Sequence, residues 1–197
     1  KSIRKDIIEE TYEVIEAIDK EDPCLMREEL GDLLWQIVFH AQLEREEGRS
    51  DMSDIIHDIC AKLVHRHPHV FGNVVADTSD VVLSNWEKIK TEEKQRNTVT
   101  SKLESVPPAL PALMRAQKIQ SKAKKAGFDW DNIDGAFEAL YSEIEELKSA
   151  MKNKDAEEIK NEMGDLLFSC VNVSRFLDVE SEEALTLSNE KFIERYV

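Results

Sequence analysis

The stretch Glu29-Leu30-Gly31-Asp32-Leu33-Leu34 recurs in this chain as Glu162-Met163-Gly164-Asp165-Leu166-Leu167, with a single apolar exchange at its second position. The two copies are separated by 133 positions, counted from Asp32 to Asp165. Self-similarity at one fixed offset is the sequence signature of a duplicated structural unit. The fold prediction therefore starts from this repeat and extends outward from it.

Carboxylates upstream of the repeated stretch follow the same offset, so each copy contains Glu-x-x-Glu followed by Glu-x-x-Asp. Residues three apart on a helix share a face, and each motif therefore forms a short carboxylate edge. Two antiparallel helices would bring two such edges together. The first set is Glu10, Glu13, Glu29 and Asp32, and the second set is Glu143, Glu146, Glu162 and Asp165.

Apolar residues recur at helical spacing through most of the chain, and no convincing alternating pattern of a strand lies between them. The fold class is therefore predicted to be all-α, as two helical-bundle domains. The domains are expected at residues 1–98 and 112–197, with a linker at 99–111 because Val106-Pro107-Pro108-Ala109-Leu110-Pro111 cannot continue a helix. Helices are predicted around residues 3–18, 30–41, 55–63, 81–96, 112–126, 133–151, 156–177 and 182–197.

The composition excludes several classes of protein. A formal charge of -15 repels a phosphate backbone, so a nucleic acid is not an expected partner. No apolar run is long enough for a membrane span. Three cysteines without a CxxC spacing argue against a disulfide framework and a zinc knuckle, and favour the reducing cytoplasm. Because the chain begins at Lys1 and stops soon after Arg195, we expect natural sequence beyond both ends.

The carboxylate sets are predicted to bind a metal ion. An isolated Glu-x-x-Glu on an acidic helix is usually a solvated face, but Glu29 and Asp32 stand among apolar residues, as do Glu162 and Asp165. Carboxylates at the edge of a core are costly unless paired. An all-oxygen site suits Mg²⁺, or Mn²⁺ in its place, and four carboxylates indicate more than one ion, completed by a polyphosphate.

Further residues near the motifs carry additional expectations. Lys191 and Arg195 lie four apart and are expected to contact phosphates, and Lys62 and Arg66 are their counterparts in the first copy. A glycine inside a helix costs about 1 kcal/mol relative to alanine, so Gly31 and Gly164 predict a close helix approach beside each site. Trp35 falls on an apolar face and is expected in the core.

These residues resemble the MazG family of nucleoside triphosphate pyrophosphohydrolases over nearly the whole chain. The resemblance rests on Glu9-Glu10-x-x-Glu13, Glu29-x-x-Asp32, Asn189-Glu190-Lys191-Phe192, Arg66-His67-Pro68-His69-Val70-Phe71 and Leu110-Pro111-Ala112-Leu113-Met114-Arg115-Ala116-Gln117-Lys118. It implies tandem all-α domains completed in a homodimer. It also implies Mg²⁺-dependent hydrolysis of ribo- and deoxyribonucleoside triphosphates, ATP included, to monophosphates and pyrophosphate.

The resemblance also implies that the second domain is the active one. Asn189 precedes Lys191 there, whereas Cys60 stands at the equivalent place before Lys62. We therefore expect Glu143, Glu146, Glu162 and Asp165 to hold the metal and carry catalysis, and Asn189, Lys191 and Arg195 to bind the nucleotide phosphates. The expected reaction is attack of a metal-activated water on the α,β-phosphoanhydride, while Glu10, Glu13, Glu29 and Asp32 form a second, largely structural set.

Two alternatives remain open from the residues alone. The same carboxylates would serve a narrower pyrophosphohydrolase acting on dUTP, dCTP or phosphoribosyl-ATP, because base selectivity is not written in them. A non-catalytic helical dimerisation or regulatory protein could use the repeat as a scaffold.

Overall fold

The computed structural model describes residues 3–74, 78–93 and 98–196, and every regular element in these ranges is a helix. This confirms the all-α prediction. The predicted helix ends at Arg96 and Val197 lie outside the described residues. The helices are α1 (Arg4–Asp19), α2 (Pro23–Glu46), α3 (Met52–Arg66), α4 (Pro68–Phe71), α5 (Ser79–Glu93), α6 (Val99–Glu104), α7 (Ala112–Lys125), α8 (Ile133–Asn153), α9 (Ala156–Phe176) and α10 (Ser181–Glu194).

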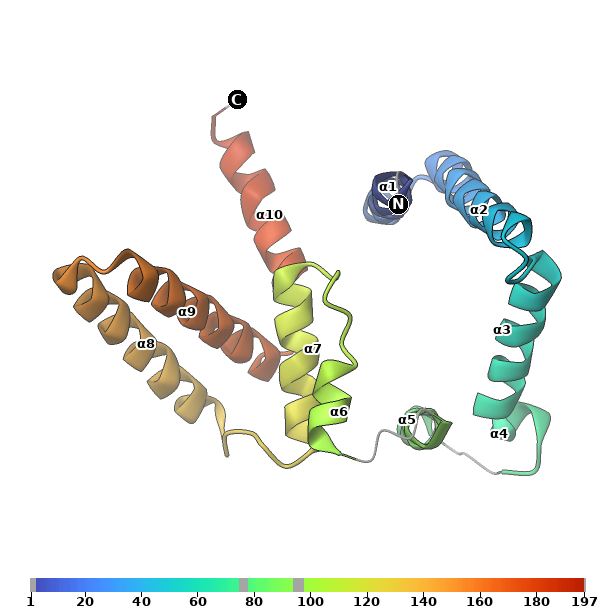
Figure 1. Ribbon diagram of the computed structural model, residues 1–197. Coiled ribbons are helices and arrows are strands. Elements are labelled where there is room, and N and C mark those ends of the chain that lie inside the picture. Colours follow the sequence, from blue (N-terminus) through green and yellow to red (C-terminus); the bar gives the residue numbers. More distant parts are fainter. Residues whose placement is uncertain (1–2, 75–77, 94–97, 197) are drawn as a thin grey trace. The chain divides into compact units, whose positions relative to one another are not determined.

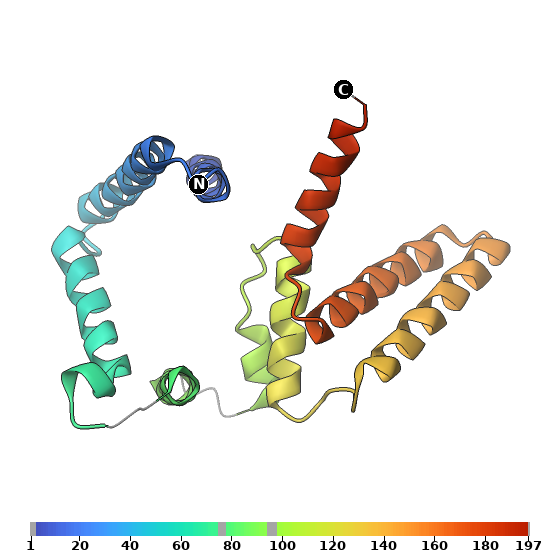
Figure 2. The same cartoon turned by 180° about the vertical axis from the view of Figure 1, so that it is seen from behind.

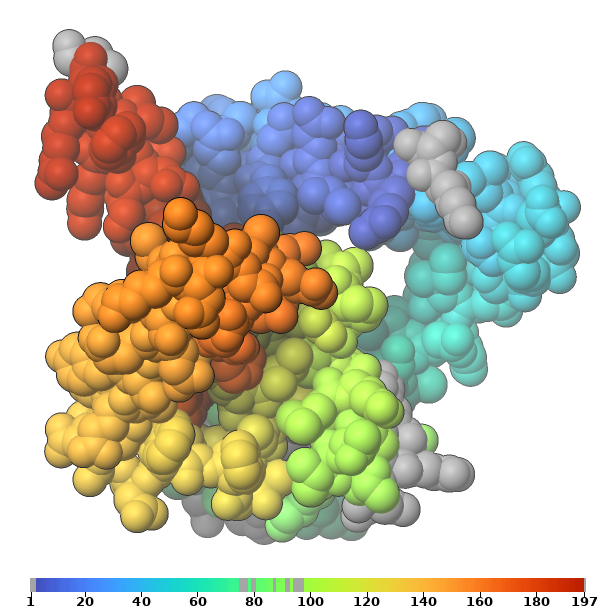
Figure 3. Space-filling view, turned by 60° about the vertical axis from the view of Figure 1, so that its left-hand side comes forward, coloured from blue at the N-terminus to red at the C-terminus, as the bar shows by residue number. Residues whose placement is uncertain are grey.

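The chain divides into two compact units, Lys1–Lys90 and Thr91–Val197. Each unit is built around one pair of long helices joined by a short turn, α1 with α2 in the first and α8 with α9 in the second (Figure 1). Because a short turn reverses the chain, the helices of each pair run antiparallel. In the space-filling view, α8 and the beginning of α9 form a continuous surface coloured yellow to orange (Figure 3).

The turns inside these two pairs repeat the 133-residue offset. Asp22 caps α2 by accepting hydrogen bonds from the backbone N–H groups of Cys24 and Leu25, and Asp155 caps α9 in the same way. The residue before each cap has positive φ, 50° at Glu21 and 58° at Lys154. An aspartate cap satisfies N–H groups that have no partner within the helix. The duplication therefore includes the turn that reverses each helix pair.

The segment predicted as a linker is partly helical. Residues Val99–Glu104 form α6, which begins with a capping box between Thr98 and Ser101 and packs against α7. Val106, just after α6, is buried. Residues 99–111 therefore belong to the second compact unit, and the proline-rich part after Val106 is its non-helical portion.

Few large side chains are fully enclosed within the described residues. The buried apolar residues are small or branched: Ala17, Ala41, Val106, Ala136, Ala150, Val171 and Val173. Trp35, expected in the core, is 61% exposed, so that expectation is wrong for the single chain. The reason is that the α1–α2 pair buries Glu29 and Gln36 of α2 rather than Trp35, whose ring has Phe39 of the same helix as a neighbour, with the ring centroids 6.0 Å apart. Among the described helices, none has the length and apolar character that a membrane crossing requires.

Candidate metal centre

Three carboxylates of the second set converge between α8 and α9. Glu143 and Glu146 extend from α8, and Glu162 extends from the second turn of α9. Each offers one oxygen, and these oxygens all lie within 4.8 Å of one another. Glu143 and Glu162 are half-buried, whereas Glu146 is exposed. The arrangement places three carboxylate oxygens together at one edge of the helix pair.

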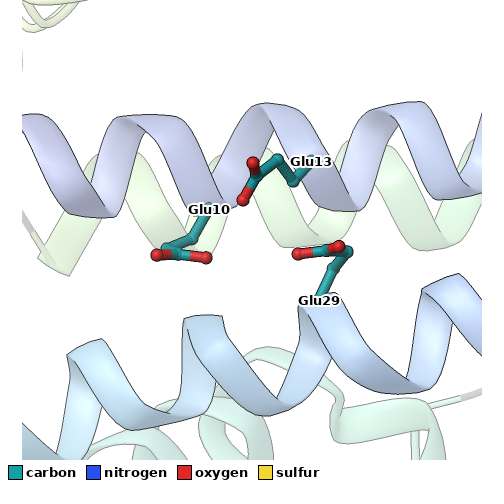
Figure 4. A group of neighbouring side chains, drawn as sticks. All are labelled: Glu10, Glu13 and Glu29. Carbon is teal, nitrogen blue, oxygen red and sulfur yellow. The ribbon is translucent and has the colours of Figure 1, made fainter.

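The first unit repeats this geometry between α1 and α2. Figure 4 shows Glu10 and Glu13 pointing from α1 toward Glu29 of α2. One oxygen from each again lies within 4.8 Å of the others, and Glu29 is only 9% exposed. The carboxylate geometry alone therefore does not distinguish the two copies.

The fourth carboxylate of each set lies beside the group of three. Asp32 and Asp165 are exposed and fall outside the 4.8 Å groups in the described residues. Their charges still act on the groups: Asp165 raises the pKa of Glu143 and of Glu162, and Asp32 does the same to Glu10 and Glu13. Each predicted quartet is therefore three convergent carboxylates with an electrostatically coupled fourth.

Burial and like charge both disfavour the ionised form of these glutamates. Burial between the helices is the largest cause of the raised pKa of Glu143, and the neighbouring charges of Glu146, Asp165 and Glu162 follow. The pKa of Glu162 is raised for the same kinds of reason, burial first. Carboxylates gathered without a counter-charge repel one another. A hard divalent cation with oxygen ligands would relieve this repulsion, so the donor set fits Mg²⁺.

The family model for the MazG nucleotide pyrophosphohydrolase domain matches this chain over residues 1–71 and 134–197. The chain belongs to the MazG family. The two matched segments start 133 positions apart, the offset that separates the two carboxylate sets. Each contains one helix pair with its three convergent carboxylates. The match fits two tandem MazG domains in one chain.

Several curated MazG-like proteins are similar to nearly all of the chain. The nucleoside triphosphate pyrophosphohydrolase of Escherichia coli (strain K12) is 48% identical over 191 residues, covering 96% of this chain and 73% of that protein. The Thermotoga maritima nucleoside triphosphate pyrophosphohydrolase/pyrophosphatase MazG is 46% identical over 195 residues, covering 99% of this chain and 73% of that protein. The Bacillus subtilis protein YabN is also 46% identical, over 196 residues, but this covers only 40% of its length.

The residues expected to bind phosphate in this MazG chain lie on α10 and its end. Asn189, Lys191 and Arg195 are all exposed. Among the described residues, no hydrogen bond or ion pair joins them to the carboxylates of α8 and α9. Figures 1 and 2 show α10 projecting beyond the α8–α9 pair. A single second unit therefore does not bring the predicted cations onto the predicted metal ligands.

Arg66, the counterpart of Arg195 in the first MazG domain, is buried against an aromatic ring. Arg66 is only 8% exposed, and its guanidinium carbon lies 5.4 Å from the centre of the Trp86 ring. The Nζ atom of Lys90 lies 4.3 Å from the centre of the same ring. A cation packed against an aromatic face gains from the interaction but is partly removed from solvent. Arg66 is thus held within its unit, while Arg195 is free to reach a ligand.

The two repeated glycines do not mark a close helix approach within a MazG unit. A β-carbon added at Gly31 or Gly164 would meet nothing within 4 Å among the neighbouring described atoms. The predicted close approach is therefore wrong for the single chain. Both glycines lie on exposed surfaces of their helices, which the other helix of each pair does not reach.

Sequence reasoning missed two polar residues that contact the carboxylates. Ser142 stands where the first domain has Glu9, and its hydroxyl donates a hydrogen bond of 2.9 Å to Oε1 of Glu146. Gln36 is buried and forms a hydrogen bond to Glu10 that favours its ionised form. The available signal was spacing, because Ser142 is four residues before Glu146 and shares its helix face.

We expect Mg²⁺ to stabilise the protein near neutral pH and to lose this effect in mild acid. Glu143 and Glu162 have raised pKa values in the folded chain, so without a cation the folded state binds protons more readily than the unfolded state. The stability of the metal-free protein should therefore rise as pH falls from the raised folded values toward their ordinary value of 4.5. Mg²⁺ binds the ionised form, so its effect should shrink over the same window.

Thermal unfolding with and without Mg²⁺, between pH 8 and pH 4.5, measures both trends. A Mg²⁺-induced rise in Tm that is the same at every pH would contradict binding through these glutamates.

Proposed function

We propose that this MazG protein hydrolyses nucleoside triphosphates to monophosphates and pyrophosphate, with Mg²⁺ held by the second carboxylate set. The observation that carries the proposal is the convergence of Glu143, Glu146 and Glu162 within 4.8 Å, with Asp165 beside them. It occurs in a chain 46% to 48% identical to proteins named nucleoside triphosphate pyrophosphohydrolases. We infer broad base specificity from the resemblance to the MazG family.

The chain's own residues have separate tasks in this reaction. Bound Mg²⁺, or Mn²⁺, would offset the charge of the triphosphate and lower the pKa of a coordinated water. Glu143, Glu146 and Glu162 would hold the cation, and the Ser142 hydroxyl would fix the orientation of the exposed Glu146 carboxylate. The raised pKa values of Glu143 and Glu162 make these carboxylates better proton acceptors than ordinary glutamates. This property suits a general base that takes a proton from the attacking water.

The second copy is the better candidate for the working site. Its Asn189, Lys191 and Arg195 are exposed and able to reach phosphates. The corresponding positions of the first copy hold Cys60, which is a poor phosphate ligand, and Arg66, which packs on Trp86. We propose that the first copy is largely structural.

A homodimer would complete both units. The chain exposes 14892 Å², whereas two separate compact domains of half its mass would together expose about 11,500 Å². Much of the excess is apolar, as the exposed fractions of 57% for Leu34 and 50% for Leu167 illustrate. Exposed apolar surface of this extent marks an association site. A second copy that covered it would enclose the carboxylate edges and could bring a partner's α10 to them.

We propose that the protein is cytoplasmic and has no nucleic-acid partner. Cys24, Cys60 and Cys170 are free and exposed, which suits the reducing cytoplasm. A formal charge of -15 disfavours a nucleic-acid partner.

Pyrophosphate release from a panel of nucleotides, with and without Mg²⁺, tests the proposed function. We expect release from ribo- and deoxyribonucleoside triphosphates only when Mg²⁺ is present. Turnover confined to dUTP, dCTP or phosphoribosyl-ATP would support the narrower enzyme instead. No release from any member of the panel, by a folded protein that still dimerises, would favour a scaffold or regulatory role.

A further inference from the structure

The helices α7 and α10 begin at the same place and cap each other. Neither has a side-chain cap of its own, because Pro111 before α7 and Glu180 before α10 make no such bond. Instead, the backbone N–H of Ser181 donates to Oε1 of Gln117 at 2.9 Å, and the backbone N–H of Met114 donates to Oε2 of Glu182 at 3.3 Å. Each helix therefore supplies the acceptor that the other helix lacks.

Gln117 fastens the turn between α9 and α10 with both ends of its amide. Its Nε2 atom donates to the carbonyl oxygen of Val179 at 3.0 Å, while Oε1 accepts from Ser181. The side chain is buried, with the residue 9% exposed. The turn also contains Asp178 with a φ of 54°. One buried amide thus holds the last residue before Glu180 and the first residue of α10.

Electrostatics make this junction dependent on its caps. Figures 1 and 2 show the beginnings of α7 and α10 beside each other, with the two helices running away from that point. The positive ends of two helix dipoles therefore meet, which is unfavourable unless negative charge lies between them. The Glu182 carboxylate supplies that charge at the first turn of α10.

In the described residues of the first copy, the corresponding helix begins with a cap of its own. Its counterpart of α10 is α3, which begins with a capping box of its own between Asp51 and Asp54. The start of α3 is thus set by local residues, whereas the start of α10 depends on a side chain 64 positions earlier in the chain. The difference separates the copy proposed to be structural from the copy proposed to be active.

The direction of α10 affects the position of Arg195 because the helix is long and a small tilt at its start displaces its far end. Within the described unit α10 contacts α7 and α9, and its residues from Leu185 onward are exposed. At 1.5 Å per residue, Arg195 lies about 21 Å along the axis from Ser181, so a tilt of about 10° at the junction moves Arg195 by roughly 4 Å. Such a displacement exceeds the tolerance of a hydrogen bond to phosphate.

We propose that Gln117 is a positioning residue for nucleotide binding, which sets the direction of α10 and thereby places Asn189, Lys191 and Arg195 against the triphosphate. The inference rests on the proposed function, because it assumes that these three residues contact the substrate. It assigns a role to α7 that the carboxylate sites do not require.

Steady-state kinetics with ATP and Mg²⁺ test the proposal in the full chain. Gln117→Ala should raise KM for ATP by about tenfold and change kcat by less than about twofold, because lost ground-state contacts appear in KM. Gln120→Ala is a matched control. Gln120 is the same residue type on the same helix and is equally buried, but its amide binds the carbonyl of Phe168 within α9 rather than the start of α10. It should lower Tm about as much as Gln117→Ala and leave KM unchanged.

Lys191→Ala separates failure of this inference from failure of the proposed function. If it raises KM and Gln117→Ala does not, the positioning role is wrong while the phosphate role stands. Equal KM increases in both glutamine variants would also overturn the inference, because general loosening would explain them. If Lys191→Ala leaves KM unchanged, the proposed phosphate role fails, and the inference fails with it.

Hydrogen exchange of the metal-free protein provides a readout independent of activity. The first turn of α10 should exchange faster in Gln117→Ala and not in Gln120→Ala. Unchanged exchange at the Ser181 amide in Gln117→Ala would overturn the proposal that Gln117 positions α10.

Discussion

Glu143→Gln is expected to lower kcat/KM for Mg²⁺-dependent pyrophosphate release by about 1,000-fold. The amide keeps the shape of the side chain but removes one negative ligand from the three that converge between α8 and α9. The loss should not come from unfolding. Because burial and like charge disfavour the ionised Glu143, a neutral side chain should raise the Tm of the metal-free protein or leave it unchanged.

Glu10→Gln is the matched control, since Glu10 occupies the same place in the first copy at the 133-residue offset. We expect near-normal turnover from this variant, because the first copy has Cys60 and a packed Arg66 where the second has Asn189 and Arg195. A collapse to background in Glu10→Gln would show that the first copy works. Unchanged turnover in both Glu143→Gln and Asp165→Asn would refute the assignment of the site.

Arg175→Ala is expected to cost about 3 to 5 kcal/mol of unfolding free energy, because it leaves a partly buried carboxylate without its partner. The Arg175 side chain is 7% exposed and that of Asp129 is 18% exposed. The guanidinium pairs with both oxygens of Asp129, reaches Oδ1 of Asn172 at 2.8 Å, and lies 4.5 Å from the centre of the Phe176 ring. This cluster joins the loop before α8 to the last turn of α9.

Urea unfolding followed by helical circular dichroism measures the cost. The double variant Arg175→Met with Asp129→Leu should recover most of the loss, because it removes both charges and keeps apolar volume. Lys148→Ala offers an exposed comparison: Lys148 pairs with Glu145 at 2.7 Å, but both side chains are more than half exposed, so the change should cost less than about 0.5 kcal/mol. A loss below about 1 kcal/mol in Arg175→Ala would contradict a buried, stabilising pair.

The sequence alone predicted the helix pairs and the residues at the candidate site. Glu143 and Glu146 had to share a face because helical geometry fixes positions three apart, and the repeated Gly-Asp-Leu-Leu showed that both copies would have the same form. The reversing turns follow from equally local chemistry, since Asp22 and Asp155 cap the helices that start beside them. Spacing and capping act within a few residues and are therefore readable from the chain.

Tertiary structure decided what covers each helix and what each helix end contacts. It separated Asp165 from the three convergent glutamates, left Trp35 and Gly164 exposed, and joined Gln117 of α7 to Ser181 at the start of α10 by a hydrogen bond. These outcomes depend on residues far apart in the chain. Helical periodicity predicts which side chains lie together on one surface of a helix. The burial and the pKa of those side chains depend on whether another helix covers that surface, and the sequence of a single helix does not determine this.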